Sequence, residues 1–559
     1  MKKITAFLMI ITLGVLPMLA QTMAQDNTKL FDAAKMKARV VKLSSDEFAG
    51  RGPGTAEGKA AAQYIADELK AMGVRPANNG SYFQNVKLFS IKTDPGTTLS
   101  ISGGSGKDGA ATYKFADEFV AFTGAQKADV SVDAELVFAG YGIKSDLYKW
   151  NDYKGSPDQY KGKVLMILVN DPPAPANEPD LFTGKALTYN GRWMYKFEEA
   201  ARRGAAGVIL VHTTESAGYG WNVVRTSNGS WRYDIAREPG DKSPYLDLKA
   251  WATEETSKKI LGQAGLKLSD LQEKAKTRDF TPVKTGLRVK CNLKAETNTV
   301  DSPNVVGVIP GVDIKLSKEY VIYSAHWDHL GVGAPNAKGD KIYNGALDNA
   351  SGCSAVLGIA EALMKIPKVN RPRRSILFLF PTAEEQGLLG AEYYAHHPLV
   401  PLDKTAGNVN IDGLNIFSKT SDFVALGAER SSLLDIVADV AKERSMTVSG
   451  DAHPEQGSFY RSDHFPFAKV GVPSISLKEG NKFIDKPADY GDKVFDEFNT
   501  KNYHQPSDEF GEWWNFESMI QECEIGLAIG LKIANTSVMP RFKTTDEFSA
   551  PDKVRMGGK

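Results

Sequence analysis

Two patterns of apolar and polar residues divide the 559-residue chain. After residue 304, short runs of consecutive apolar residues alternate with segments in which apolar residues recur every three or four positions, the spacing of a helix. The runs lie at residues 305–309, 320–324, 376–380, 409–411 and 474–477, and the helical segments include 354–364 and 433–444. Because unbroken apolar strands are buried on both faces of a sheet, we predict an α/β fold with a mostly parallel mixed sheet flanked by helices.

A different pattern covers residues 93–290. Short strands, such as those at 135–138 and 163–169, are separated by loops rich in proline and glycine. A helix at 193–203 leads into a strand at 207–211, so we predict that this β-rich stretch is a separate module. Before it, residues 55–72 have helical spacing and end at Gly73, which favours a helix end there. The polar residues 536–559 are expected to form a flexible C-terminal tail.

The first 24 residues have the order of a signal peptide. Two lysines follow Met1, residues 4–20 are nearly all apolar, and polar residues come next, with Ala24 at the expected cleavage position. A membrane span needs about 20 apolar residues, so this run is slightly short for one. We therefore predict a periplasmic or secreted protein with no membrane contact after cleavage; the alternatives are a buried N-terminal helix or a membrane anchor.

Composition narrows the classes of function. The 68 basic and 68 acidic residues balance, so a strongly basic face for binding nucleic acid is not expected. Hydrophobic residues make up 42% of the chain, which is ordinary for a folded protein and excludes a mainly disordered one. The three cysteines, Cys291, Cys353 and Cys523, permit at most one internal disulfide.

Histidine and carboxylate side chains stand where the predicted strands end. His326 and Asp328 follow the run at 320–324, Glu384 and Glu385 follow the run at 376–380, and Asp412 follows the run at 409–411. Asp348 opens the helix near residue 354, and His504 is the later histidine expected to join them. The carboxyl ends of parallel strands form one crevice, so these groups are expected to meet. Histidines and carboxylates without cysteine suit zinc or a similar divalent ion, and a carboxylate-rich set suits a bridged pair of ions.

Two roles can be argued from neighbouring positions. Glu384 and Glu385 point in different directions, so one can bind metal while the other faces the bound water as general base. Asp328 is placed to accept the second ring N–H of His326 and to fix its tautomer. The residues alone leave open which carboxylate bridges the ions and which glutamate is the base.

The sequence resembles the zinc aminopeptidase and glutamate-carboxypeptidase family of co-catalytic metallopeptidases. The motifs that carry the resemblance lie at residues 326–329, 348–352, 384–390, 410–412 and 503–504, with further similarity at 43–83 and 462–467. Residues 163–211 resemble the protease-associated domain that some members carry as an insertion. The resemblance implies a discontinuous zinc peptidase domain, residues 25–92 and 291–535, interrupted by an inserted region at 93–290.

The resemblance also implies individual roles and two zinc ions per chain. One zinc is held by His326 and Asp412, a second by Glu385 and His504, with Asp348 bridging both, Glu384 as general base and Tyr503 donating to the oxyanion. His329 is then expected to be a hydrogen-bonded loop histidine. The predicted protein is an exported two-zinc aminopeptidase that acts on peptides.

Three other readings of the same motifs remain. A carboxypeptidase or dipeptidase would use the same catalytic residues but would recognise a free carboxylate through arginine, for which Arg461 is the only hint. A relative that cyclises N-terminal glutamine is disfavoured because the two-metal ligand set is complete. An inactive receptor-like protein is the third reading, and it should have lost metal ligands that are present here.

Overall fold

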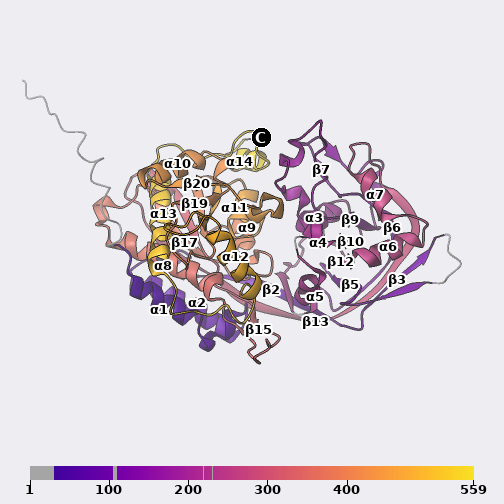
Figure 1. Ribbon diagram of the computed structural model, residues 1–559, viewed down its shortest axis with the longest axis horizontal. Helices are drawn as coiled ribbons and strands as arrows, with labels where there is room; N and C mark the ends of the chain where they lie inside the picture. Colours follow the sequence, from indigo (N-terminus) through magenta and orange to yellow (C-terminus); the bar gives the residue numbers. More distant parts are fainter. Residues whose placement is uncertain (1–29, 105–109, 218, 230, 559) are drawn as a thin grey trace, which may run out of the picture.

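The computed structural model describes residues 30–104, 110–217, 219–229 and 231–558, so the predicted signal peptide lies outside the described residues. The molecule has two lobes side by side, joined by long strands (Figure 1). The main lobe has its core in residues 31–74 and 305–534, and the inserted lobe has a separate core in residues 99–293. This division follows the change of pattern in the sequence.

The main lobe is built on a mixed sheet. Its strands, from one edge to the other, are β11 (Arg232–Ile235), β2 (Phe83–Thr93), β13 (Val283–Ile309), β17 (Ser375–Phe380), β14 (Tyr320–Ser324), β18 (Thr405–Ile411), β21 (Ser474–Glu479), β19 (Asp422–Leu426) and β20 (Thr447–Ser449). The short strand β1 (Arg75–Pro76) pairs with the end of β13. The four central strands β17, β14, β18 and β21 are parallel to one another. Strands β13 and β19 run antiparallel to their neighbours β17 and β21. The predicted fold class, a mostly parallel mixed sheet flanked by helices, is confirmed.

Helices cover both faces of this sheet. The bounds are α1 (Ala33–Leu43), α2 (Ala56–Ala71), α8 (Gly352–Lys365), α10 (Leu433–Glu443) and α13 (Phe516–Asn535) on one face, and α9 (Leu389–His396) and α11 (His464–Lys469) on the other. Along β14, Val321 and Tyr323 enter the first of these cores, whereas Ile322 enters the second. Alternate residues of one strand thus bury apolar side chains in opposite directions, which is why the sequence shows unbroken apolar runs.

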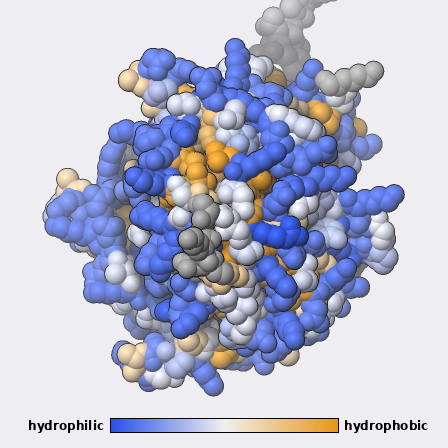
Figure 2. Space-filling view, turned by 90° about the vertical axis from the view of Figure 1, so that its right-hand side faces the viewer, coloured by the Kyte–Doolittle hydropathy of each residue, from blue (hydrophilic) through white to orange (hydrophobic). Residues whose placement is uncertain are grey.

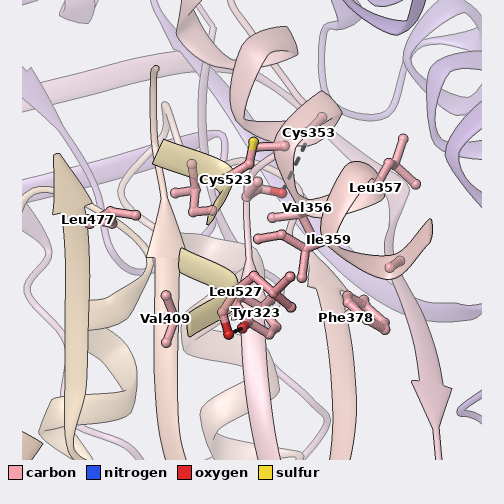
Figure 3. Close-up of a cluster of buried hydrophobic side chains, with 14 of the residues drawn as sticks. Tyr323, Cys353, Val356, Leu357, Ile359, Phe378, Val409, Leu477, Cys523 and Leu527 are labelled. Carbon is pink, nitrogen blue, oxygen red and sulfur yellow. Dashed lines mark hydrogen bonds between the residues drawn. The ribbon is translucent and has the colours of Figure 1, made fainter. Parts of the chain in front are cut away.

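The larger core is shown in Figure 3, where sheet residues such as Tyr323 and Phe378 meet Ile359 of α8 and Leu527 of α13. The Tyr323 hydroxyl donates to the carbonyl of Gly526 at 2.9 Å, so this buried polar atom is satisfied. The three cysteines are all buried and free, and they act as small apolar residues in the two cores.

Helix α2 shows how local sequence sets an element. The Thr55 hydroxyl accepts the N–H of Gly58 at 2.9 Å and caps the first turn. Gly73, just past the last turn, has φ +79°, a conformation that glycine adopts at little cost. The helix predicted from this pattern is confirmed within one residue at each end.

The inserted lobe has a sheet of its own. Its strands are β3 (Thr98–Gly103), β4 (Ala111–Lys114), β5 (Phe119–Phe122), β6 (Asp129–Phe138), β9 (Val164–Leu168), β10 (Gly207–His212) and β12 (Leu248–Thr253). Helices α3 (Trp193–Arg202), α6 (Glu254–Gly262) and α7 (Leu268–Ala275) pack on this sheet. The end of the molecule formed by this lobe is largely hydrophilic, with a smaller hydrophobic area near its centre (Figure 2).

One strand belongs to both lobes. Residues 283–294 of β13 pair with β3 and β6 of the inserted lobe, whereas residues 295–309 pair with β2 and β17 of the main lobe. In Figure 1, β2 and β13 cross together from one lobe to the other. The antiparallel ribbon of β2 and β13 therefore makes both covalent connections between the lobes, and its two strands are hydrogen-bonded to each other.

The end of the chain differs from the expected flexible tail. Helix α14 (Ser549–Arg555) packs back on the main lobe, and Phe542 and Phe548 are buried. The Asp552 carboxylate accepts the N–H of Phe542 at 2.9 Å and lies 2.8 Å from the Arg541 guanidinium. Phe542 and Phe548 belong to one small hydrophobic cluster, with ring centroids 5.6 Å apart, but the segment between them has no repeating apolar pattern that would have predicted it.

Among the described residues, no helix combines the length and the apolar content that a membrane crossing requires.

Candidate metal centre

Six predicted side chains converge at the carboxyl ends of the central strands. His326 follows β14, Glu384 and Glu385 follow β17, Asp412 follows β18, Asp348 precedes α8, and His504 follows α12 (Tyr490–Lys501). Parallel strands carry their carboxyl ends to one edge, so residues far apart in sequence meet there. The structure therefore brings together all of the residues expected to hold metal.

Asp348 lies between the two histidines. Its Oδ1 is 3.2 Å from Nε2 of His326, and its Oδ2 is 3.2 Å from Nε2 of His504. The same His326 nitrogen is 3.2 Å from Oδ1 of Asp412, and the same His504 nitrogen is 3.0 Å from Oε2 of Glu385. One carboxylate is thus shared by two groups, each containing one histidine and one further carboxylate, which is the arrangement that a bridging ligand requires.

His329 also lies in this centre. It is fully buried, and its Nδ1 is 2.6 Å from Oε1 of Glu385, so it is a hydrogen-bonded histidine. Two sets of three side chains each bring one potential ligand atom per residue to within 4.8 Å of the others. The first set is His329, Asp348 and Glu385, and the second is His326, Glu384 and Asp412. Glu385 therefore contacts a histidine through each of its two oxygens. A contact of this kind fixes the direction of a ligand carboxylate.

The predicted contact of Asp328 with His326 is wrong. The His326 ring Nδ1 lies 3.1 Å from the backbone carbonyl of Asp328, whereas the Asp328 carboxylate is 3.9 Å from that nitrogen. The carboxylate instead accepts the N–H of Glu384 at 3.0 Å. The turn after β14 brings the carbonyl back to the ring and directs the side chain towards the next loop. Burial raises the pKa of Asp328 to about 7.

Asp508 holds the loop that carries Asp348. Its carboxylate accepts the N–H of Leu347 at 2.9 Å and the N–H of Asp348 at 3.1 Å. These bonds anchor a π-helical turn, Ala346–Ser351, immediately before α8. Asp508 is close in sequence to His504, but only the folded chain shows that it supports Asp348.

Arg51 is a second residue whose role the sequence did not reveal. It is fully buried and donates to the carbonyls of Leu43, Trp327, Asn344 and Gly345 at 2.5–2.9 Å. The carbonyl of Leu43 ends α1, and the other three belong to the loop after β14 and to the loop before Asp348. A single guanidinium has five N–H donors, so Arg51 can tie several loops of the centre together. The glycine-rich turn around it was the only local signal.

Buried negative charge dominates the centre. Burial alone would raise the pKa of Asp412, but Lys478 and His326 outweigh it and lower that pKa to about 2. Burial raises the pKa of Glu384 well above its usual value; His326 opposes this shift, and Asp412 and Glu385 add to it. Clustered carboxylates away from water are costly unless cations neutralise them. Oxygen and imidazole donors in two groups around a shared carboxylate fit two divalent ions of the zinc type.

Tyr503 lies on the open side of this centre. Its ring stacks on that of His504, with centroids 3.9 Å apart and planes at 23°, and about half of the residue (49%) is exposed. The stacking fixes the orientation of the His504 ring. It also holds the phenol ring against the histidine that contacts Asp348 and Glu385.

Comparisons with known proteins agree with the motifs. Residues 304–521, which contain every residue of the centre, match the model of Peptidase family M28. Aminopeptidase YwaD of Bacillus subtilis (strain 168) is 29% identical over 34% of this chain and 38% of its own length. Aminopeptidase NAALADL1 of Mus musculus is 32% identical over 24% of this chain and 17% of its own length. The chain thus spans less than two fifths of these relatives, and the family resemblance predicted from the motifs is confirmed.

The fold is shared more widely than the sequence. A solved aminopeptidase from Aneurinibacillus sp. strain AM-1 aligns with 92% of this chain and 96% of its own, with a TM-score of 0.50 and 19% identity. This likeness extends over both lobes.

Proposed function

We propose that the protein is a two-zinc exopeptidase, an aminopeptidase that releases N-terminal residues from peptides. The observation that carries the proposal is the Asp348 carboxylate, which lies 3.2 Å from a histidine on each side. The match to Peptidase family M28 and the similarity to proteins named aminopeptidases support the reaction class.

Each metal position has its own ligands. His326 and Asp412 would hold one zinc, Glu385 and His504 would hold the second, and Asp348 would contact both. Bound zinc supplies a Lewis acid for the scissile carbonyl and lowers the pKa of a water molecule. Lys478 donates to the Asp412 carbonyl at 2.7 Å and steadies this edge of the centre.

Glu384 acts as the general base. Its Oε2 is 4.0 Å from the His326 Nε2, so the carboxylate faces the centre. The carboxylate takes a proton from the attacking water and later gives it to the leaving amine. The bond from the Glu384 N–H to Asp328 holds its backbone during both transfers. The Tyr503 phenol donates a hydrogen bond to the developing oxyanion, an interaction typically worth about 3 kcal/mol.

The proposed location is outside the cytoplasm. The signal-like order of residues 1–24 supports export to the periplasm or medium. The inserted lobe, with its protease-associated character, is proposed to narrow access to the centre and to favour short or unfolded peptides. Fractionation of the natural host, with a blot for the full-length and the processed chain, tests the location.

Mass spectrometry of one defined, unblocked pentapeptide after incubation with the zinc-loaded protein tests the activity. A ladder that shortens from the N-terminus supports the proposal, and the Glu384→Gln variant should produce it far more slowly. Shortening from the C-terminus would identify a carboxypeptidase on the same scaffold. Tight metal binding without turnover of any peptide would identify an inactive, receptor-like protein.

A further inference from the structure

A cavity of about 210 Å³ lies where the two lobes meet. The inserted lobe contributes Leu187 and Arg192 to its lining, and the main lobe contributes Glu455 and Arg461. The two sides are joined by a hydrogen bond from the Leu187 N–H to the carbonyl of Pro454 at 2.9 Å. The cavity is therefore completed only when the lobes are in contact.

Two guanidinium groups, those of Arg192 and Arg461, line this cavity. The Nε of Arg192 is buried and has no hydrogen-bond partner among the described residues. Over the same residues, neither Arg192 nor Arg461 is in an ion pair within 4.0 Å. Burial, and then the charge of Arg461, lowers the pKa of Arg192 to about 10, so Arg192 stays positive at neutral pH. Buried polar groups nearly always have partners, and two unpaired guanidiniums that repel each other favour an anion between them.

The backbone adds positive potential at the same place. Arg192 is the residue before the first turn of α3, and no side chain caps that turn. The first N–H groups of a helix attract anions. Trp193, the first residue of α3, also lines the cavity. The two carboxylates of the lining, Glu215 and Glu455, are exposed to solvent, and Glu455 lies 3.4 Å from the ring of His453 rather than beside a guanidinium.

The cavity and the metal centre share one loop. Arg461 directly precedes Ser462, whose hydroxyl donates to Oδ2 of the metal-centre residue Asp412 at 2.6 Å. Consecutive Cα atoms are about 3.8 Å apart, and an extended peptide advances about 3.3 Å per residue. A peptide with its scissile bond at the centre therefore reaches the arginines within a few residues.

We propose that this cavity is a subsite for a carboxylate of the peptide substrate, held between Arg192 and Arg461. The carboxylate is either the C-terminus of a short peptide or an acidic side chain, and both present the same planar group to a guanidinium. The proposal rests on the peptidase function proposed above. It adds a substrate class: short or acidic peptides.

Two matched pairs of peptides test the subsite on the zinc-loaded protein. One pair differs in a free C-terminus or a C-terminal amide, and the other in Glu or Gln at one position. In one of the two pairs, we expect the KM of the peptide with the carboxylate to be about tenfold lower than that of its uncharged partner. This difference corresponds to one charge-assisted hydrogen bond. The Arg461→Gln and Arg192→Gln variants should lose that preference, and Arg461→Lys should keep part of it. The pair that responds identifies the source of the carboxylate.

Controls separate the subsite from the reaction and from folding. Arg288→Gln alters an exposed arginine of the inserted lobe that pairs with Asp133, and it should keep the wild-type preference. Leucine 4-nitroanilide, which has no carboxylate, should be cleaved equally by all variants. Failure of the wild-type protein to shorten any member of the peptide pairs would contradict the peptidase function, and calorimetry with the same peptide pairs would then still test binding.

The subsite proposal is overturned if both arginine variants keep the wild-type ratio for each peptide pair. Arg461 is exposed, so its replacement by glutamine should leave the packing of the protein intact. If Arg192→Gln fails to fold, the Arg461→Gln variant alone tests the subsite.

Discussion

Two clusters of buried charge, one in each lobe, have opposite character. In the inserted lobe, Lys196 is fully buried and donates to the Asn170 carbonyl at 3.0 Å. Asp171 accepts from the N–H and hydroxyl of Thr188, and Asp152 accepts from the Ile143 N–H and the Trp150 ring. Every charged group of this cluster has a polar partner inside the protein.

The metal centre is not closed in this way. Carboxylates outnumber basic groups, and buried atoms near them have no hydrogen-bond partner among the described residues, including both oxygens of Asp463 and one of Asp328. A cluster whose charges and hydrogen bonds are satisfied internally stabilises a fold, whereas one that leaves negative charge over is completed by a ligand. Both clusters contain buried charged groups, so burial alone does not distinguish a structural cluster from a ligand site.

Removal of the shared carboxylate should have the largest effect. Asp348→Asn keeps the shape of the side chain but removes the charge that two ions share. We expect peptidase activity to fall by at least about a hundredfold, since metal-ion stabilisation is worth several kcal/mol. Metal content, measured by mass spectrometry of the purified protein, should fall below two ions per chain. Asp403→Asn, at a partly exposed position, serves as control, and full metal content with full activity in Asp348→Asn would contradict a bridging role.

The general base can be separated from the metal ligands. Glu384→Gln should lower kcat by about 10²–10⁴, the usual contribution of proton transfer by a positioned group. Metal content and KM should change little, because Glu384 is not assigned to either ion. A variant that keeps the wild-type kcat would show that another group moves the proton.

The cluster of the inserted lobe should respond in stability rather than activity. Lys196→Met leaves Asp152 and Asp171 without their cation, and we expect the free energy of unfolding to fall by about 3 kcal/mol. Denaturant unfolding measures this, and Lys276→Met, at the partly exposed residue that follows α7, is the control. If Lys196→Met lost bound zinc but kept its stability, the structural role assigned to this cluster would be wrong.

The smallest effect concerns pH. Burial raises the pKa of Asp171 to about 7 and that of Asp152 to about 6, whereas an unfolded aspartate titrates near 3.9. The folded state therefore binds more protons between these values, so these groups contribute less stability as the pH rises from about 4 to 7. Asp171→Asn should flatten this dependence, measured as the difference in Tm between pH 4.5 and 7.5. An unchanged difference would show that Asp171 does not titrate in this range.

The strands that carry the centre could be predicted because each is apolar on both sides. The runs before His326, Glu384 and Asp412 end where β14, β17 and β18 end. The positions of these ligands follow from strand ends, and the division of roles between them came from the family motifs. The local sequence was sufficient to predict a ligand position where a buried apolar strand is followed directly by a histidine or a carboxylate.

Supporting contacts could not be predicted in this way. Arg51 and Asp508 act on loops about 300 and 160 positions away, and nothing beside them in sequence records those partners. The error at Asp328 has a related cause, because two residues of separation allow either the carbonyl or the carboxylate to meet the His326 ring. The ordered C-terminal segment was missed because single phenylalanines dock without a repeating pattern.

The continuous strand β13 has a mechanical consequence. Its 27 residues are hydrogen-bonded to neighbours in both lobes, with no loop between the two halves. Such a ribbon offers no flexible loop as a hinge, so a relative movement of the lobes would require the paired strands to bend along their length. Direct contacts between the lobes, such as the Leu187–Pro454 hydrogen bond and the Lys469–Glu198 ion pair, oppose that bending beside the cavity that Arg192 and Arg461 line.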